Sequence, residues 1–212
     1  MTAILTSSPA NSPSIPPRRS KAEQVLIDYV LQFAPLSEQE IDQILALINI
    51  RSYSKGKVLL REGQIGNVCY FVLQGCVRQY YLTHEGDEKT THFFTEGMPV
   101  TSTCSFDNKP VKHYLVCNED SIVVEGRPED EQFFMQAMPR METINRVGVE
   151  FELQKSQETL AEFIMSSPEE RYLNLLNTRP ELLDRVPQYQ LASYLGVTPE
   201  SLSRIRKRIM ER

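Results

Sequence analysis

Between residues 51 and 127 the chain consists of short β-prone runs separated by turn residues. Glycines punctuate this region, among them Gly56, Gly63, Gly75 and Gly97. The runs lie at residues 57–60, 68–73, 77–82, 90–94, 113–117 and 121–124. Many short strands at near-regular spacing are typical of a barrel or jelly roll. We therefore predict an α+β chain whose β part is a double-stranded β-helix, or jelly roll.

Helical patterns stand on both sides of this β region. Before it, apolar residues recur at helical spacing from Lys21 to Phe33. Ser37 and Glu40 then form a capping-box signature ahead of a second helix. The first 19 residues are rich in Ser, Pro and Thr, which predicts a flexible tail. The predicted parts are a tail (1–19), a helical lead-in with a β-roll (20–127), a long helix (128–165) and a C-terminal helical domain (166–212).

The predicted long helix carries apolar residues at three- and four-residue steps, such as Ile144, Val147 and Phe151. A small β-domain cannot cover an apolar stripe of this length. Pairing with a second copy buries it, so we predict a homodimer through this helix. The alternative is a helix that folds back on its own β-domain, and the polar segment Gln154–Thr159 keeps that alternative open.

Two short helices joined by a tight turn are predicted near the end of the sequence. Leu191 and Leu195 share one face of the first helix, and Gly196 follows where helices commonly end in a left-handed residue. Thr198 can cap the second helix, with Pro199 at its first position. This layout is typical of a helix-turn-helix with a reduced or absent wing.

The second of these helices has two different faces. Leu202, Ile205 and Ile209 fall on one side. The opposite side, within an arc of roughly 100°, carries Glu200, Ser203, Arg204 and Lys207. Residues 199–212 contain five basic and two acidic residues, a net charge of +3, whereas the whole chain has −5. A basic end on an acidic body favours a local nucleic-acid contact, and the alternative is a helical hairpin with a solvated charged face.

Composition excludes several other classes of protein. The four cysteines form no C-x-x-C pair, so we predict no metal, no cofactor and reduced thiols. His84, His92 and His113 are isolated, which gives a cupin-type enzyme little support. No signal peptide is recognisable, and no apolar run approaches the ~20 residues of a membrane span. We predict a cytoplasmic protein with no membrane contact.

The order of these parts resembles the bacterial Crp/Fnr family of transcription regulators, over about residues 36–208. Residues 55–78, with Lys-Gly, Glu-Gly and Tyr-Phe-Val-Leu-Gln-Gly-Cys-Val-Arg, look like the start of the family's β-roll. Residues 191–205, with Leu-Ala, Leu-Gly-Val and Glu-Ser-Leu-Ser-Arg-Ile, resemble its helix-turn-helix. The resemblance implies that Glu200, Ser203 and Arg204 read bases. Predicted contacts to the DNA backbone are Thr198, Ser201, Lys207 and Arg208.

The family's cyclic-nucleotide site is altered in this sequence. Thr101 and Ser102 stand where the resemblance leads us to expect Gly-Glu, and no arginine occurs between Arg78 and Arg127. A cyclic phosphate without a bidentate arginine loses its strongest contact. No cysteine cluster for iron–sulfur binding lies near the N-terminus. We therefore predict a regulator that does not respond to cyclic AMP. Its candidate effector pocket consists of Thr101, Ser102, Lys112 and His113, and its effector is unknown.

The sequence thus predicts a sequence-specific DNA-binding regulator that binds a palindromic operator as a homodimer, contacts RNA polymerase and has no enzymatic activity. A second hypothesis is a small-molecule sensor whose β-roll binds an effector other than a cyclic nucleotide. A cupin-type enzyme is the third.

Overall fold

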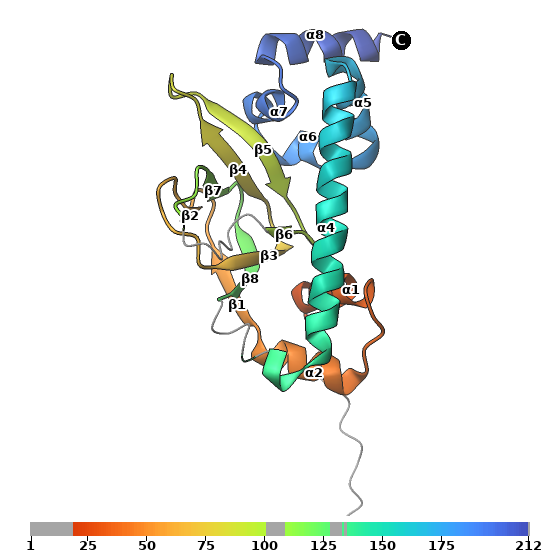
Figure 1. Ribbon diagram of the computed structural model, residues 1–212. Helices are drawn as coiled ribbons and strands as arrows, with labels where there is room; N and C mark the ends of the chain where they lie inside the picture. Colours follow the sequence, from red (N-terminus) through yellow and green to blue (C-terminus); the bar gives the residue numbers. More distant parts are fainter. Residues whose placement is uncertain (1–18, 101–108, 128–132, 134, 212) are drawn as a thin grey trace, which may run out of the picture.

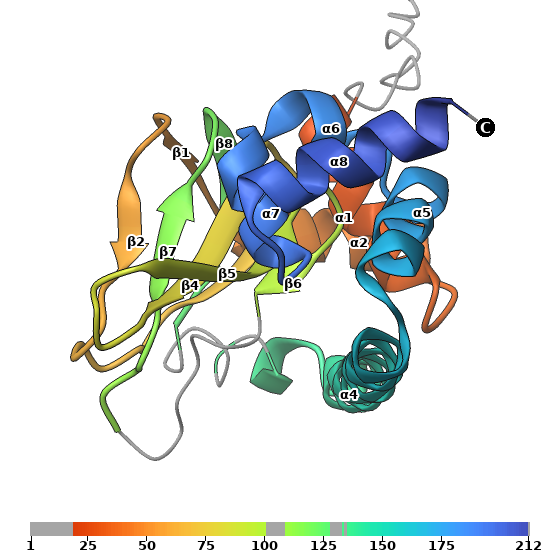
Figure 2. The same ribbon diagram turned by 90° about the horizontal axis from the view of Figure 1, so that it is seen from above.

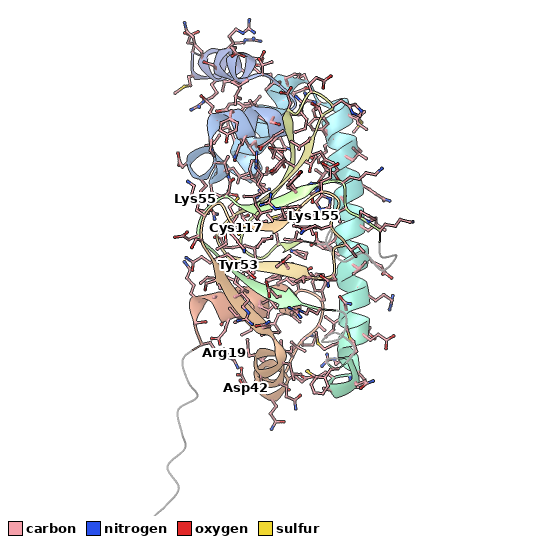
Figure 3. All side chains as sticks on the ribbon, turned by 90° about the vertical axis from the view of Figure 1, so that its left-hand side faces the viewer. Arg19, Asp42, Tyr53, Lys55, Cys117 and Lys155 are labelled. Carbon is pink, nitrogen blue, oxygen red and sulfur yellow. The ribbon has the colours of Figure 1, made fainter. Side chains whose placement is uncertain are left out.

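The computed structural model describes residues 19–100, 109–127, 133 and 135–211. Two antiparallel sheets form a roll, with helices α1 and α2 at one end and a helical unit at the other. A long helix, α4, runs beside the roll and connects the two ends (Figures 1 and 3). The predicted α+β fold, a β-roll followed by a helical C-terminal part, is confirmed.

The two N-terminal helices begin where side chains satisfy free backbone N–H groups. Helix α1 (Lys21–Leu31) begins after Ser20 and α2 (Glu38–Leu47) after Ser37. In α2 the Ser37 hydroxyl accepts a hydrogen bond from the Glu40 amide, and the Glu40 carboxylate accepts one from the Ser37 amide at 2.7 Å. The predicted capping box is therefore present.

Among the described residues, eight strands make up the two sheets of the roll, and their pairings are antiparallel. One sheet has the order β1 (Asn49–Tyr53), β8 (Ser121–Gly126), β3 (Cys69–Gln74) and β6 (Pro99–Val100). The other has the order β2 (Val58–Leu60), β7 (Tyr114–Cys117), β4 (Val77–Leu82) and β5 (Glu88–Phe94). A fully or nearly buried cluster that includes Val72, Val77, Phe94, Leu115 and Val123 fills the space between the sheets.

All six predicted β runs contain a strand, whereas β1 and β6 were not predicted. The middle three residues of β1 are exposed, so its sequence shows no apolar alternation. Strand β6 is only two residues long and pairs with β3 through Tyr70 and Phe71. Neither strand leaves a pattern that local sequence reasoning can detect.

The outer face of the first sheet is covered by α1, α2 and the beginning of α4 (Arg140–Met165). The buried side chains between these helices and the sheet form a second apolar cluster, which includes Val30, Ile44, Phe71 and Ile144. The predicted helix over residues 128–165 is interrupted: Phe133 and residues 135–137 are helical, and α4 begins only after Pro139. Proline lacks an N–H and clashes with the preceding turn, which explains the break.

Four helices form the C-terminal unit: α5 (Pro168–Thr178), α6 (Leu182–Arg185), α7 (Gln188–Tyr194) and α8 (Pro199–Met210). Tyr172, Leu182, Leu191 and Leu202 belong to its core, which also contains Phe93 of strand β5. Within residues 166–211 the structure has no strand, which agrees with a reduced or absent wing.

Cysteine usage differs from the sequence prediction. Cys69 is disulfide-bonded, whereas Cys76 and Cys117 are free and buried. The prediction of reduced thiols is thus wrong for Cys69, because sequence spacing does not show which Cα atoms come within bridging distance. None of the helices in the described part of the chain is long and apolar enough to cross a bilayer.

Candidate nucleic-acid interface

Helix α8 is fixed at its start by the turn that precedes it. Gly196 has a φ of 70°, and a Cβ there would lie 3.0 Å from the Phe163 ring of α4. The Thr198 hydroxyl accepts a hydrogen bond from the Ser201 amide at 3.2 Å, and Pro199 occupies the first helical position. Leu202 is fully buried beneath the helix. The predicted turn, cap and packing face are all present.

The opposite face of α8 is open to solvent. Glu200, Ser203 and Arg204 are all exposed on it, and α8 lies across the end of the molecule in Figures 1 and 2. Hydrogen bonds from its own backbone amide and from Thr198, with a smaller contribution from Arg204, lower the pKa of the Glu200 carboxyl. The face therefore presents an ionised carboxylate, a hydroxyl and a guanidinium side by side.

The predicted backbone-contacting residues have partners within the protein. The Arg208 guanidinium forms an ion pair with Glu169 of α5 at 2.9 Å. Lys207 lies 3.8 Å from Glu211, and both side chains are largely exposed. The Ser201 hydroxyl accepts hydrogen bonds from Thr198 at 3.1 Å and from Arg204 at 3.3 Å. A phosphate must therefore compete with Glu169 for Arg208.

The helix-turn-helix rests directly on the roll, through α7 and β5 (Figure 1). The Ser193 hydroxyl accepts a hydrogen bond from the Thr90 amide at 2.9 Å and donates one to the Glu88 carbonyl at 3.1 Å. Phe93, on the same strand, is fully buried and stacks edge-on against Tyr194 at 5.3 Å. Strand β5 thus contributes its inner face to the roll and its outer face to the core of the C-terminal helical unit.

An arginine on α6 adds a charged contact to this junction. Arg185 donates to both carboxylate oxygens of Glu96, at 2.8 and 2.9 Å, and to Glu119 at 2.8 Å. These bonds, Glu96 first, raise the pKa of the Arg185 guanidinium. Burial alone raises the pKa of Glu96, but the hydrogen bonds from Arg185 and from backbone amides outweigh it and the pKa is lowered. The Arg185 clamp, as we call Arg185, Glu96 and Glu119, had no sequence signal, since its members lie far apart in the chain.

From Val149 onward, α4 carries an apolar stripe whose side chains are largely exposed, and of these the Phe163 ring packs against Arg171 and Gly196 of the C-terminal unit. Val149, Leu153, Leu160 and Phe163 are between 41% and 60% exposed, and with Ser156 they follow the alternating four- and three-residue steps of a coiled-coil seam. The beginning of α4 packs against its own roll, as the alternative expected, whereas Leu153 and Leu160 further along are exposed.

The candidate effector pocket is only partly described. Thr101 and Ser102 lie outside the described residues. His113 is buried, its ring 5.6 Å from Tyr81, and burial lowers its pKa. Lys112 is exposed. The structure therefore does not bring Lys112 and His113 together.

Arg78, the last arginine before Arg127, already has partners on the outer face of the roll. Arg78 pairs with Glu88 and stacks over the Tyr80 ring at 4.3 Å. Its side chain is therefore committed to these neighbours.

The sequence of the chain is similar to known proteins over both the roll and the C-terminal helices. Residues 50–137 match the model of the cyclic nucleotide-binding domain family. The fumarate and nitrate reduction regulatory protein of Vibrio cholerae is 27% identical over 189 residues, which cover 83% of this chain and 75% of that protein.

Solved structures share the fold at lower identity. The regulator CLP of Xanthomonas campestris, described as c-di-GMP responsive, superposes with a TM-score of 0.64 at 20% identity, covering 82% of this chain and 92% of that one. FixK2 of Bradyrhizobium japonicum gives 0.63 at 17% identity, covering 77% and 85%. The Thermus thermophilus catabolite activator protein gives 0.52 at 22% identity, covering 84% and 86%.

A β-roll of the cyclic nucleotide-binding type followed by a helix-turn-helix defines a class of transcription regulators. The resemblance to the Crp/Fnr family that the sequence indicated is confirmed: the roll matches the cyclic nucleotide-binding domain family, and the chain is similar to such regulators in sequence and fold.

Proposed function

We propose that the protein is a sequence-specific DNA-binding transcription regulator that acts as a homodimer on a palindromic operator and is not an enzyme. The observation that carries this proposal is the open face of α8, where Glu200, Ser203 and Arg204 lie together on the second helix of a helix-turn-helix. Contact with RNA polymerase, a cytoplasmic location and the domain boundaries at residues 19, 127 and 165 are parts of the same proposal.

Each side chain on that face has a chemical role at a base edge. The Arg204 guanidinium can donate two parallel hydrogen bonds to guanine O6 and N7. Glu200 can accept from a cytosine amino group or orient Arg204, and Ser203 can do either more weakly. The backbone role falls to Lys207 and Arg208, whose charges supply affinity without sequence information.

The exposed apolar stripe on α4 supports the homodimer. Exposed apolar side chains at coiled-coil spacing are stabilised by a second copy of the same helix. Two α8 helices related by a two-fold axis then read half-sites about 34 Å apart. A closed two-fold arrangement also accounts for a palindromic operator.

The effector part of the proposal is that cyclic AMP is not the signal. Arg78 is already held by Glu88 and Tyr80, so its guanidinium is not available to a cyclic phosphate inside the roll. A second function, sensing of another small molecule by the roll, is favoured by the buried His113. Its Nε2 atom has no hydrogen-bond partner among the described residues, and a buried polar atom of this kind favours a ligand that supplies one.

Selection of binding sites from random DNA tests the main proposal. We expect a palindromic consensus, and Arg204→Ala should lose about 1–3 kcal/mol on that consensus and relax the base preference at one position. Arg206→Ala on the same helix removes the same charge from a less exposed position outside the reading face, so it is the matched control and should keep the preference. A selection without a palindrome, or equal losses in the two variants, contradicts the proposal.

A further inference from the structure

A cavity of about 600 Å³ lies between α1, the first half of α4 and the sheet that contains β3 and β8. Small-molecule sites in proteins commonly fall between about 300 and 1,000 Å³. The residues that line the cavity do not include Lys112 or His113, so it is separate from those members of the candidate effector pocket.

The sequence of α4 explains why a cavity exists here. Met141, Ile144 and Gly148 face the core and are buried, and Glu152 is the next residue on the same stripe. A Cβ at Gly148 would already touch the Phe33 ring at 3.7 Å. The stripe thus continues with a glycine, over which the Phe33 ring packs, and then with a carboxylate, and neither adds an apolar side chain to the core.

Aromatic rings form one wall of the cavity. Tyr29 packs against Phe71 with ring centroids 4.8 Å apart and against Phe33 at 5.1 Å. Phe33 in turn contacts Phe151 of α4 at 5.7 Å. Aromatic rings pack well against apolar groups of a ligand, and the faces of the rings attract cations.

The charges of the lining favour a cation. Glu152 and Glu125 are both partly buried, whereas the basic residue of the lining, Arg127, is exposed. Burial raises the pKa of the Glu152 carboxyl, and Lys155 and the Tyr29 hydroxyl offset part of that effect. A carboxylate that is partly removed from water gains more from a bound cation than an exposed one does.

We propose that this cavity binds an organic cation with an apolar body, such as an arylalkylamine. Its ammonium group pairs with Glu152, and its body packs against Tyr29, Phe33 and Phe71. Val149 lines the cavity and also belongs to the exposed stripe of α4, so an occupant lies next to the surface through which a second copy would pair. This site goes beyond the DNA-binding role and does not depend on it.

Isothermal titration calorimetry on the full chain tests the proposal with three probes of matched shape: 4-phenylbutylamine, 4-phenylbutanol and 4-phenylbutyrate. We expect the amine to bind about tenfold more tightly than the alcohol, and the carboxylate to bind most weakly. Equal affinities for the three probes, or no binding of the amine, would overturn the proposal.

Two variants locate the site. Glu152→Gln should remove the preference for the amine, whereas Glu158→Gln, an exposed acid on the same helix that is bonded to Gln154 at 2.9 Å, should keep it. Gly148→Met fills the cavity and should weaken all three probes, with circular dichroism to verify folding. If Glu152→Gln keeps the preference, or folded Gly148→Met binds as the wild type does, the ligand lies elsewhere.

Discussion

Gly75, in the turn between β3 and β4, leaves no room for a side chain. Its φ is 99°, and a Cβ would lie 2.5 Å from the Ser121 hydroxyl oxygen and 2.6 Å from the Asp120 carbonyl oxygen. The second contact is with backbone, which cannot move aside by a rotamer change. The turn therefore requires glycine for two separate reasons, its conformation and the space around it.

Replacing Gly75 with alanine should therefore destabilise the fold, and the same change at Gly86 provides a control. Gly86→Ala, at a φ of 88° with no atom within 4 Å, carries only the conformational penalty of about 1 kcal/mol. Gly75→Ala adds the clash and should lose at least about 2 kcal/mol more. Urea denaturation measures both losses. Equal losses in the two variants would show that the space around Gly75 is not the constraint.

At the scale of elements, the Arg185 clamp joins α6 to the loops that follow β5 and β7. Because the native structure lowers the pKa of Glu96, its ionised form is the one that the fold favours. A lowered carboxyl pKa contributes stability above the unfolded-state value, which is about 4.3 for Glu, and this stability is lost as the pH falls through the folded pKa. The clamp therefore stabilises the junction at neutral pH and releases it in acid.

Arg185→Gln tests this junction. At pH 7 the variant should unfold at lower urea concentration than the wild type, and the difference should shrink below about pH 4 as Glu96 is protonated. Arg146→Gln removes an exposed pair with Glu150 on α4 and serves as the control, with little change at either pH. A pH-independent loss in Arg185→Gln would mean that the side chain acts by packing and not by charge.

Elements held by neighbours in sequence could be predicted, and those held by distant partners could not. The Ser37 and Thr198 caps and the exposed face of α8 follow from spacing over a few residues, and the structure shows them. The Arg185 clamp joins residues 89 and 66 positions apart. The docking of Ser193 on Thr90 spans 103 positions. Such contacts depend on how finished elements pack, which no local pattern records.

At the scale of the whole molecule, we propose that the apolar stripe on α4 determines how many copies act together. Leu153→Glu with Leu160→Glu places two carboxylates on this stripe and should convert the dimer to monomer, as measured by analytical ultracentrifugation. Ile65→Glu changes a residue of similar exposure in the segment between β2 and β3 and should leave the dimer intact. Dimers of the double variant, or monomers of the wild type, would contradict a dimer through α4.

The same double variant predicts a change in how DNA binding responds to salt. In the proposed dimer each α8 contacts phosphates through its own Lys207 and Arg208. The logarithm of affinity falls with the logarithm of salt concentration in proportion to the number of such contacts. A monomer that engages one half-site should therefore show about half the slope of the dimer, together with a lower affinity at every salt concentration. Fluorescence anisotropy over a salt series on the full palindrome measures both quantities. If the monomer keeps the full slope, a single copy makes all the phosphate contacts, and the two α8 helices do not share the operator.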